Sequence, residues 1–321
     1  MTTILITGGH SGIGLAASRK LAAQKVDLVL AGRSPDRMRE VADELRSSYG
    51  TSVRTVALEL SSLESVRAAA ATIESMLASG ELTSLDAIVC NAGGRFDGAI
   101  SFSPEGYETT FATNYLGHFL LVEQLLPKLS RNGRVVYTAS GTHDPDSMDG
   151  KMVGAAVEPD AFALAEVGKN GDAALSAGKR YSSSKLCAVM YVYELDRRLR
   201  KAGSAVSAIA FDPGSIPETG FLRGMPAPMR RLSTTSAMKW VSQRLGVTTS
   251  DVAFSGASLA ALATENGYVD ASGTYFQAHE GTLTAVRSAK VSYDLRRAAK
   301  LWEDTEELVG LRIRGEATQP R

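Results

Sequence analysis

Short apolar runs alternate with longer amphipathic segments from the start of the chain. The run ILIT at residues 4–7 is followed by a helical pattern, and the same succession recurs along most of the sequence. The apolar runs contain many β-branched residues without regular polar alternation, which is typical of strands buried on both faces of a parallel sheet. The expected strands are 4–7, 26–32, 52–60, 85–90, 133–140, 204–214 and 273–277. The expected helices are 12–23, 36–49, 62–78, 105–129, 180–202 and 249–264.

Repeated strand–helix–strand units predict an α/β fold of the Rossmann type, a doubly wound, mostly parallel sheet of seven strands with helices on both faces. We expect a single domain over residues 1–321. Two segments interrupt the alternation: an acid-rich stretch at 141–178, and a stretch with prolines, methionines and arginines at 215–248. Each follows the carboxyl end of an expected strand, where open α/β sheets bind ligands. We interpret them as an active-site insertion and a substrate lid; the alternative is two surface elaborations without a role.

Composition and charge exclude several classes of function. The chain contains 35 Lys and Arg against 35 Asp and Glu, so no net charge indicates nucleic acid or an anionic membrane as a partner. The two cysteines, Cys90 and Cys187, cannot form a disulfide framework and suit a reducing compartment. We see neither a signal peptide nor an apolar stretch long enough to span a bilayer. We therefore expect a cytoplasmic protein that acts on a small molecule and, because its histidines are scattered, holds no metal.

The segment TGGHSGIG at residues 7–14 joins the first expected strand to the first expected helix. Gly8 would permit the sharp turn, Gly12 would let the backbone approach a pyrophosphate, and Gly14 would let the helix pack closely. The phosphates would then face free N–H groups at the positive end of a helix. We predict a dinucleotide site here; the alternative is a tight turn that binds nothing.

The residues after the second strand indicate which dinucleotide binds. An NAD site usually has an acid there that accepts hydrogen bonds from the ribose 2′-hydroxyl. This chain has Arg33 instead, with Arg37 beyond it, and a guanidinium can bind a 2′-phosphate through two hydrogen bonds. His10 in the glycine turn could add a donor. We predict NADPH/NADP+ as the cofactor; the alternative is an arginine that merely lies at a strand end.

Further motifs follow in a fixed order along the chain. They are CNAGG at 90–94, TNYLGHFLL at 113–121, VVYTAS at 135–140, YSSSK at 181–185 and DPGSIPETG at 212–220. With the glycine turn they resemble the short-chain dehydrogenase/reductase family, from residue 2 to about 280. TNYLGHFLL, the long insertion before YSSSK, and PETGFLR are most similar to the branch of light-dependent protochlorophyllide reductases and retinol dehydrogenases. Residues 291–310 also resemble the end of the reductase chain.

The resemblance implies four catalytic residues, Asn114, Ser140, Tyr181 and Lys185. Hydride transfer to a carbonyl needs an electrophilic carbon, so Ser140 and Tyr181 would hydrogen-bond the oxygen and Tyr181 would donate the proton. Lys185 lies one helical turn after Tyr181 on the same face, where an ammonium favours the phenolate. The family also implies that Lys185 holds the nicotinamide ribose and that Asn114 orders a water. The Tyr-x-x-x-Lys spacing alone would be weak evidence, because it occurs by chance in many helices.

A wider set of cofactor contacts is also implied. These residues are Gly8, His10, Ser11, Gly12, Ile13, Gly14, Arg33, Arg37, Leu60, Asn91, Ala92, Gly93, Tyr181, Lys185, Pro213, Gly214, Ile216 and Thr219. Thr219 would hydrogen-bond the carboxamide or a phosphate. Cys187 lies half a helical turn from Lys185 and therefore points away from that face; we interpret it as a buried apolar residue.

Together these features predict an NADPH-dependent oxidoreductase that reduces the carbonyl of a bulky aromatic or polycyclic molecule, with Tyr181 as proton donor. Two alternatives stay open: reduction of a carbon–carbon double bond in a tetrapyrrole, and a regulator that binds NADPH without catalysis. Ser215 stands where protochlorophyllide reductases carry a cysteine, which weighs against photochemistry. Family members often form dimers or tetramers through helices equivalent to 105–129 and 180–202, and both a homodimer and a monomer are compatible with this sequence.

Overall fold

The computed structural model is described here for residues 2–169, 171, 174–216 and 247–312. Its centre is one sheet with the strand order β3-β2-β1-β4-β5-β6-β7-β8. The strands are β1 (Thr3–Thr7), β2 (Asp27–Gly32), β3 (Val53–Ala57), β4 (Ala87–Cys90), β5 (Arg134–Thr138), β6 (Ser207–Asp212), β7 (Thr274–His279) and β8 (Thr282–Ala285). The first seven strands are parallel, which confirms the predicted doubly wound α/β fold.

Strand β8 is an addition to the predicted seven. It pairs antiparallel with β7, and the register His279 to Thr282 leaves a loop of two residues. Both loop residues, Glu280 and Gly281, have positive φ, which is the conformation of a type I′ hairpin turn. The strand is four residues long and mostly exposed, so it lacks the buried apolar run by which the other strands were recognised.

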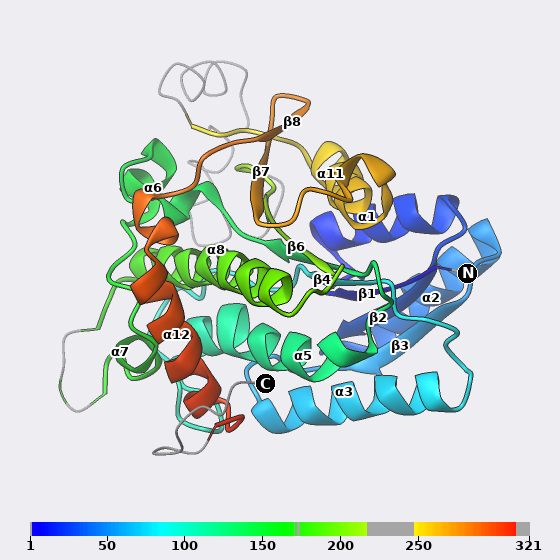
Figure 1. The fold of residues 1–321 in the computed structure, drawn as a ribbon, viewed down its shortest axis with the longest axis horizontal. Coiled ribbons are helices and arrows are strands. Elements are labelled where there is room, and N and C mark those ends of the chain that lie inside the picture. The colour runs from blue at the N-terminus through cyan, green and yellow to red at the C-terminus, as the bar shows by residue number, and fades with distance from the viewer. Residues whose placement is uncertain (1, 170, 172–173, 217–246, 313–321) are drawn as a thin grey trace.

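Helices cover both faces of the sheet (Figure 1). One face carries α1 (Gly12–Ala23), α2 (Pro35–Tyr49) and α11 (Val252–Thr264), which share a core cluster with the sheet. The other face carries α3 (Leu63–Ala78), α5 (Gly117–Leu125) and α8 (Ala177–Lys201), which contribute to a second core cluster. Apolar residues of the buried strands thus face two separate cores, as their uninterrupted pattern predicts.

The helix predicted over 105–129 is divided into shorter elements. It consists of α4 (Thr109–Phe111), a π-helical turn (Ala112–Leu116), α5, and a 3-10 turn (Leu126–Lys128). Pro127 has no N–H to donate, which explains why the regular helix ends there. The π-helical turn carries Asn114, and such turns are frequent at functional sites.

The predicted insertion at 141–178 contains a 3-10 turn (Gly141–His143), α6 (Met148–Val153) and α7 (Ala161–Ala165), and it runs into α8. Of the lid predicted at 215–248, only residues 215–216 and 247–248 belong to the described part of the chain. Two 3-10 turns, Asn266–Tyr268 and Lys290–Tyr293, complete the secondary structure of the described residues outside α12.

Helix α12 (Leu295–Leu308) crosses the α5–α8 face (Figure 1). Its Trp302 is buried, stacks on Tyr191 with ring centroids 5.3 Å apart, and meets Phe119 edge-on at 5.0 Å. The Arg198 guanidinium lies 4.2 Å from the Trp302 ring centroid. The surface that the family resemblance implies for subunit contacts is therefore partly covered by the chain's own α12.

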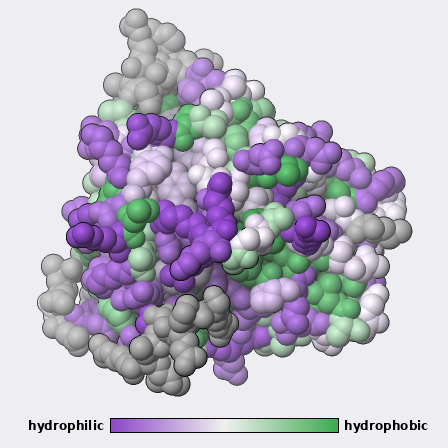
Figure 2. All heavy atoms as spheres, viewed as in Figure 1, coloured by the Kyte–Doolittle hydropathy of each residue, from purple (hydrophilic) through white to green (hydrophobic). Residues whose placement is uncertain are grey.

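The molecular surface shows hydrophilic and hydrophobic residues interspersed over one face (Figure 2). Among the helices that the structure describes, none combines the length and apolar character needed to cross a membrane.

Candidate active site

A cavity of about 1060 Å³ runs along the carboxyl ends of the strands. Strand ends of one parallel sheet meet at one edge, so motifs distant in sequence come together there. Every described residue of the predicted cofactor set lines this cavity, and so do Ser140, Tyr181 and Lys185. Asn114 does not line it, and Thr219 lies outside the described residues.

The glycine turn forms one end of the cavity and fits a phosphate group. Gly12 has φ of +52°, and a Cβ placed on it would meet no atom within 4 Å, so its backbone faces open space at the start of α1. A Cβ on Gly14 would lie 2.4 Å from the Gly8 carbonyl oxygen and 2.6 Å from Asn91 Nδ2. Gly14 therefore permits close packing within the turn itself, and the first N–H groups of α1 stay accessible to an anion.

Three basic side chains gather where β2 ends. His10 is mostly buried against Gly32, and its Nδ1 has no hydrogen-bond partner in the described structure. Burial lowers the pKa of His10, and the positive charges of Arg37 and Arg33 lower it further. The Arg33 side chain is 69% exposed and lies 4.0 Å from a Glu59 carboxylate oxygen, so this weak ion pair leaves it available to a ligand.

Thr7, the last residue of β1, connects that strand to the loop after β4 and to α5. Its hydroxyl oxygen accepts hydrogen bonds from the backbone N–H groups of Asn91 and Ala92, at 2.9 and 3.0 Å. The same oxygen lies 2.9 Å from His118 Nε2. Burial lowers the pKa of His118 to about 3, so this imidazole is neutral near pH 7. Sequence reasoning gave Thr7 and His118 no role, because their contacts join segments far apart in the chain.

Ser140 and Tyr181 meet at the other end of the cavity. The two hydroxyls share a hydrogen bond, which by itself lowers the pKa of Tyr181. Burial is the larger effect and raises the pKa of Tyr181 to about 12, with a further contribution from the Asp212 charge. The phenol is therefore protonated at neutral pH. The lowering that sequence analysis expected from a neighbouring lysine is not found here, because desolvation of the phenolate dominates.

Lys185 lies one turn further along α8. Its Nζ donates to the Thr138 carbonyl oxygen at 2.7 Å and lies 5.7 Å from the Tyr181 ring centroid. Burial lowers the pKa of Lys185 to about 8, and the Asp212 charge opposes that lowering. The predicted pair thus shares a face and an environment, as their spacing indicated.

Asn114 hydrogen-bonds the backbone and side chains that surround this site. Its Oδ1 accepts from Gly94 N–H at 2.9 Å, and its Nδ2 donates to Gly94 O and Ser184 Oγ, each at 3.0 Å. Its backbone carbonyl accepts from the Tyr137 hydroxyl at 2.8 Å. Asn114 therefore fastens the loop after β4 to α8, and in this structure its polar atoms are engaged with protein groups.

His143, which sequence analysis left without a role, supports Ser140. His143 contacts the Ser140 carbonyl oxygen through Nδ1 at 2.8 Å and accepts from Ala289 N–H through Nε2 at 3.0 Å. Because Nε2 accepts, the proton is on Nδ1, and burial lowers the pKa of His143. Cys187 is fully buried and its thiol pKa is raised by desolvation, which confirms the interpretation of an inert apolar residue.

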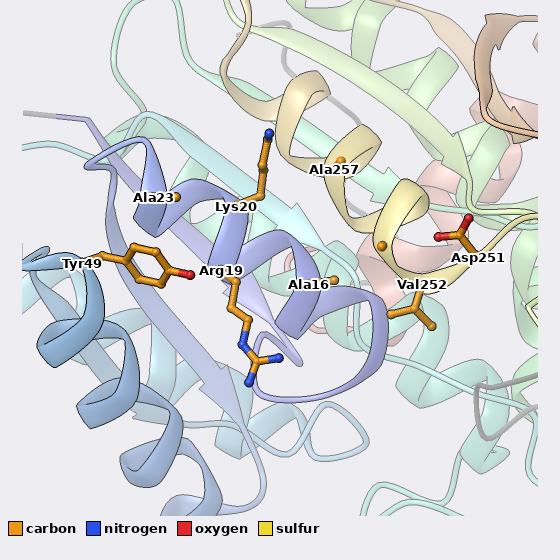
Figure 3. Close-up of a pocket in the computed structure, with 9 residues that line it drawn as sticks. Ala16, Arg19, Lys20, Ala23, Tyr49, Asp251, Val252 and Ala257 are labelled. Carbon is orange, nitrogen blue, oxygen red and sulfur yellow. The ribbon is translucent and has the colours of Figure 1, made fainter.

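A second cavity of about 600 Å³ lies between α1 and α11 (Figure 3). Ala16, Ala23 and Ala257 line it with Tyr49 at one end, and Arg19 is paired with Glu44 at 2.8 Å. It contains none of the sequence motifs. Across the described residues, no group of three or more His, Cys, Asp or Glu side chains is arranged to hold a metal ion.

Comparison with known proteins agrees with this geometry. The family model for short chain dehydrogenases matches residues 2–151. A chloroplastic protochlorophyllide reductase of Chlamydomonas reinhardtii is 30% identical over 323 residues, which cover 96% of this chain and 78% of that protein. The chain belongs to the short-chain dehydrogenase family. It is therefore an oxidoreductase that uses NAD(P) and acts on small molecules.

Other family relatives support the same assignment. The short-chain dehydrogenase TIC 32 A of Brassica napus, also chloroplastic, is 28% identical over 315 residues, or 96% of this chain and 88% of the relative. Among solved structures, an uncharacterised protein from Mycobacterium paratuberculosis superposes with a TM-score of 0.67 at 24% identity, covering 97% of this chain and 94% of the other. This last similarity shows the shared fold.

Proposed function

We propose that this short-chain dehydrogenase is an NADPH-dependent reductase of carbonyl compounds. The observation that carries the proposal is the Ser140–Tyr181 hydroxyl pair, which lies in one cavity with the glycine turn and its basic cluster. A dinucleotide extended along this cavity would span from the phosphate end to the paired hydroxyls. Arg33 and Arg37 support NADPH over NADH because they present positive charge and hydrogen-bond donors where a 2′-phosphate would bind, and His10, whose pKa is lowered, would add a neutral ring as a hydrogen-bonding group.

The residues divide the chemistry among them. Bound NADPH would supply a hydride, that is a proton with two electrons, to the carbonyl carbon and would thereby become NADP+. The Ser140 and Tyr181 hydroxyls would donate hydrogen bonds to the carbonyl oxygen, which develops negative charge as the hydride arrives. Tyr181 would then transfer its proton to that oxygen, giving the alcohol. Lys185 would orient the cofactor ribose and return a proton to Tyr181 from bulk solvent.

The cavity walls support a bulky substrate. Beyond the cofactor residues, the lining includes Phe96 from the loop after β4 and Val153 from α6 of the 141–178 insertion. The insertion therefore contributes directly to the space beside Ser140 and Tyr181. We assign 141–178 as an active-site insertion within a single domain, and an aromatic or polycyclic ketone or aldehyde as the substrate class.

The first experiment tests Tyr181 as the proton donor. Purified protein is screened with NADPH and a panel of aromatic and polycyclic carbonyl compounds, following nucleotide absorbance. With an active substrate, Tyr181→Phe should lower kcat by about 10²–10⁴-fold, the usual contribution of a general acid, and keep NADPH affinity. Tyr193→Phe is the matched control, since Tyr193 also lies on α8 and its hydroxyl lies 2.8 Å from Ser288 Oγ. Full activity of Tyr181→Phe would remove Tyr181 from the mechanism.

The second experiment tests the cofactor. Arg33→Ala should lose about 1–3 kcal/mol of NADPH affinity, a charge-assisted interaction, and leave NADH affinity unchanged. Arg39→Ala is the control, because Arg39 is an exposed arginine of α2 that pairs with Asp36. Equal kcat/KM of the wild type with NADPH and NADH would contradict the proposed preference.

A second candidate function is reduction of a carbon–carbon double bond in a tetrapyrrole. Its support is the similarity to protochlorophyllide reductases along 96% of this chain. Ser215 lines the cavity and is held by backbone hydrogen bonds with Thr248 and Ser250. Mixing the protein with NADPH and protochlorophyllide, in darkness and under illumination, separates the candidates. A light-dependent spectral change would favour tetrapyrrole reduction, and no change together with carbonyl turnover would exclude it.

A further inference from the structure

Asp212 is a buried carboxylate at the reacting end of the cavity that the mechanism above does not use. It ends β6 and is 1% exposed. Its Oδ1 accepts from Gly214 N–H, and its Oδ2 accepts from the Tyr275 hydroxyl and Gln277 Nε2, all at 3.0 Å. Within the described residues, no lysine, arginine or histidine nitrogen forms an ion pair with it within 4.0 Å. Three neutral donors therefore hydrogen-bond this carboxylate, and no cationic side chain of the described residues contacts it directly.

The position of Asp212 follows from strand order. Strands β5 and β6 are neighbours, so the end of β6 lies beside the residues that follow β5. A Cβ placed on Gly141 would lie 3.1 Å from Asp212 Oδ2, and Gly141 directly follows Ser140. The Asp212 charge acts on both Tyr181 and Lys185. Pro213 and Gly214, which follow it, line the cofactor cavity.

We propose that Asp212 is a positioning residue whose negative charge favours bound NADP+ over bound NADPH and so biases the bound nucleotide toward its oxidised form. This proposal rests on the proposed function. A fixed negative charge opposes formation of the Tyr181 phenolate, the form from which alcohol oxidation starts, and it equally opposes loss of the Tyr181 proton during reduction. The same charge favours the cationic nicotinamide ring of NADP+ over the neutral ring of NADPH, which assists hydride departure. The two effects oppose each other while the proton leaves Tyr181, so the preference for NADP+ is expressed in nucleotide binding, and the equilibrium in free solution is unchanged.

Other charged groups facing Tyr181 do not replace Asp212. Arg95 acts with the opposite sign on Tyr181, and its side chain is paired with Asp97 at 2.9 Å. Asp149, on α6, accepts from Thr248 N–H at 3.3 Å. Burial and the Asp212 charge raise the pKa of Asp149.

Further titratable neighbours are Tyr275, which donates to Asp212, and His143 and Lys185. His143 is buried with a lowered pKa and its ring nitrogens are engaged with Ser140 and Ala289. On the same helix as Tyr181, the Lys185 Nζ lies 5.7 Å from the Tyr181 ring centroid and donates to Thr138 O rather than to a carboxylate, whereas Arg180 is paired with Glu108. Among the described residues, Asp212 is thus a buried carboxylate of the reacting end without an ion-pair partner within 4.0 Å, and Lys185 acts on it from beyond that distance.

The decisive experiment measures nucleotide binding without turnover. Dissociation constants of NADP+ and NADPH are determined by titration calorimetry for the wild type and Asp212→Asn. The two rings differ by one unit of charge, and a unit charge within about 10 Å at a dielectric constant of about 20 changes such an equilibrium by roughly tenfold. Asp212→Asn should therefore raise Kd(NADP+)/Kd(NADPH) about tenfold, mainly through weaker NADP+ binding.

Asp86→Asn is the matched control. Asp86 also accepts three hydrogen bonds, from Thr3 N–H, Ser84 Oγ and Ser130 Oγ. It precedes β4 and therefore lies at the amino-terminal ends of the strands, away from the cavity. Asp86→Asn should leave Kd(NADP+)/Kd(NADPH) unchanged. An unchanged ratio in Asp212→Asn, with both nucleotides still bound, overturns the inference and leaves the proposed function intact. A wild type that binds neither nucleotide overturns both.

A second variant and a second measurement guard against local misfolding. Asp212→Ser also removes the carboxylate and should change the ratio in the same direction. The pH profile of alcohol oxidation is recorded beside it, since this direction requires Tyr181 to lose its proton. In both variants the alkaline midpoint of that profile should move down by about one pH unit, because one pKa unit corresponds to one tenfold change in the equilibrium. A midpoint that stays at the wild-type pH contradicts the inference.

Discussion

The ion pair between Arg180 and Glu108 offers a quantitative test of how the active-site helix is held. Arg180 directly precedes Tyr181 on α8, and its Nε lies 3.0 Å from Glu108 Oε1. The two side chains are only 5% and 2% exposed. The guanidinium also donates to the Leu175 and Phe96 carbonyl oxygens, at 2.7 and 3.0 Å. The pair therefore joins α8, the insertion and the loop after β4 at one point.

The magnitude follows from burial and distance. At 3.0 Å and an effective dielectric constant of about 20, the Coulomb attraction is roughly 5 kcal/mol. Desolvation of both charges offsets much of this attraction, so the net contribution of the pair is small. Removing one partner leaves the other charge buried, which costs about 3–5 kcal/mol. Glu108→Gln should therefore lower the free energy of unfolding by that amount.

The assay is urea unfolding monitored by circular dichroism. With a slope of about 2–3 kcal/mol/M, the midpoint of Glu108→Gln should fall by about 1–2.5 M. The double variant Glu108→Gln/Arg180→Met removes both charges and should cost at least about 2 kcal/mol less than the sum of the single variants. Glu44→Gln, which breaks the exposed Arg19–Glu44 pair, should change stability by about 1 kcal/mol or less. A change of similar size for Glu108→Gln would refute the reasoning.

Two further predictions concern α12 and His118. Trp302→Ala should cost about 3–5 kcal/mol of unfolding free energy, because a buried indole is lost from its contacts with Tyr191 and Phe119. Leu295→Ala, at an exposed position of α12, is the control and should cost little. Equal urea midpoints for the two variants would contradict this prediction. Folding lowers the pKa of His118 from 6.5 to about 3, so between these pH values the unfolded chain binds a proton at His118 that the folded chain does not. Stability present above pH 6.5 should therefore be lost as the pH falls toward 3, by up to about 1.4 kcal/mol per pH unit. His118→Asn should flatten the dependence of unfolding free energy on pH in this window, and an unchanged slope would show that other groups produce it.

The parts of the site that sequence predicted are those whose geometry is local. Gly8, Gly12 and Gly14 lie within one turn, and Tyr181 and Lys185 lie one helical turn apart, so chain spacing alone places each group together. Alternating apolar and amphipathic segments likewise determine the doubly wound sheet, because buried parallel strands require crossover helices on both faces. The chemical type of the site follows from these local groups and from the order of the motifs.

Tertiary structure decided everything that depends on which segments become neighbours. Asp212 lies beside Gly141 because β6 pairs with β5. Asn114, within the π-helical turn, hydrogen-bonds Gly94 and Ser184, which are distant from it in sequence. Burial raises the pKa of Tyr181, although the sequence pattern of tyrosine and lysine predicts a lowering. Sequence spacing places groups along one element, but their charge states depend on the desolvation and fields that only the packed fold produces.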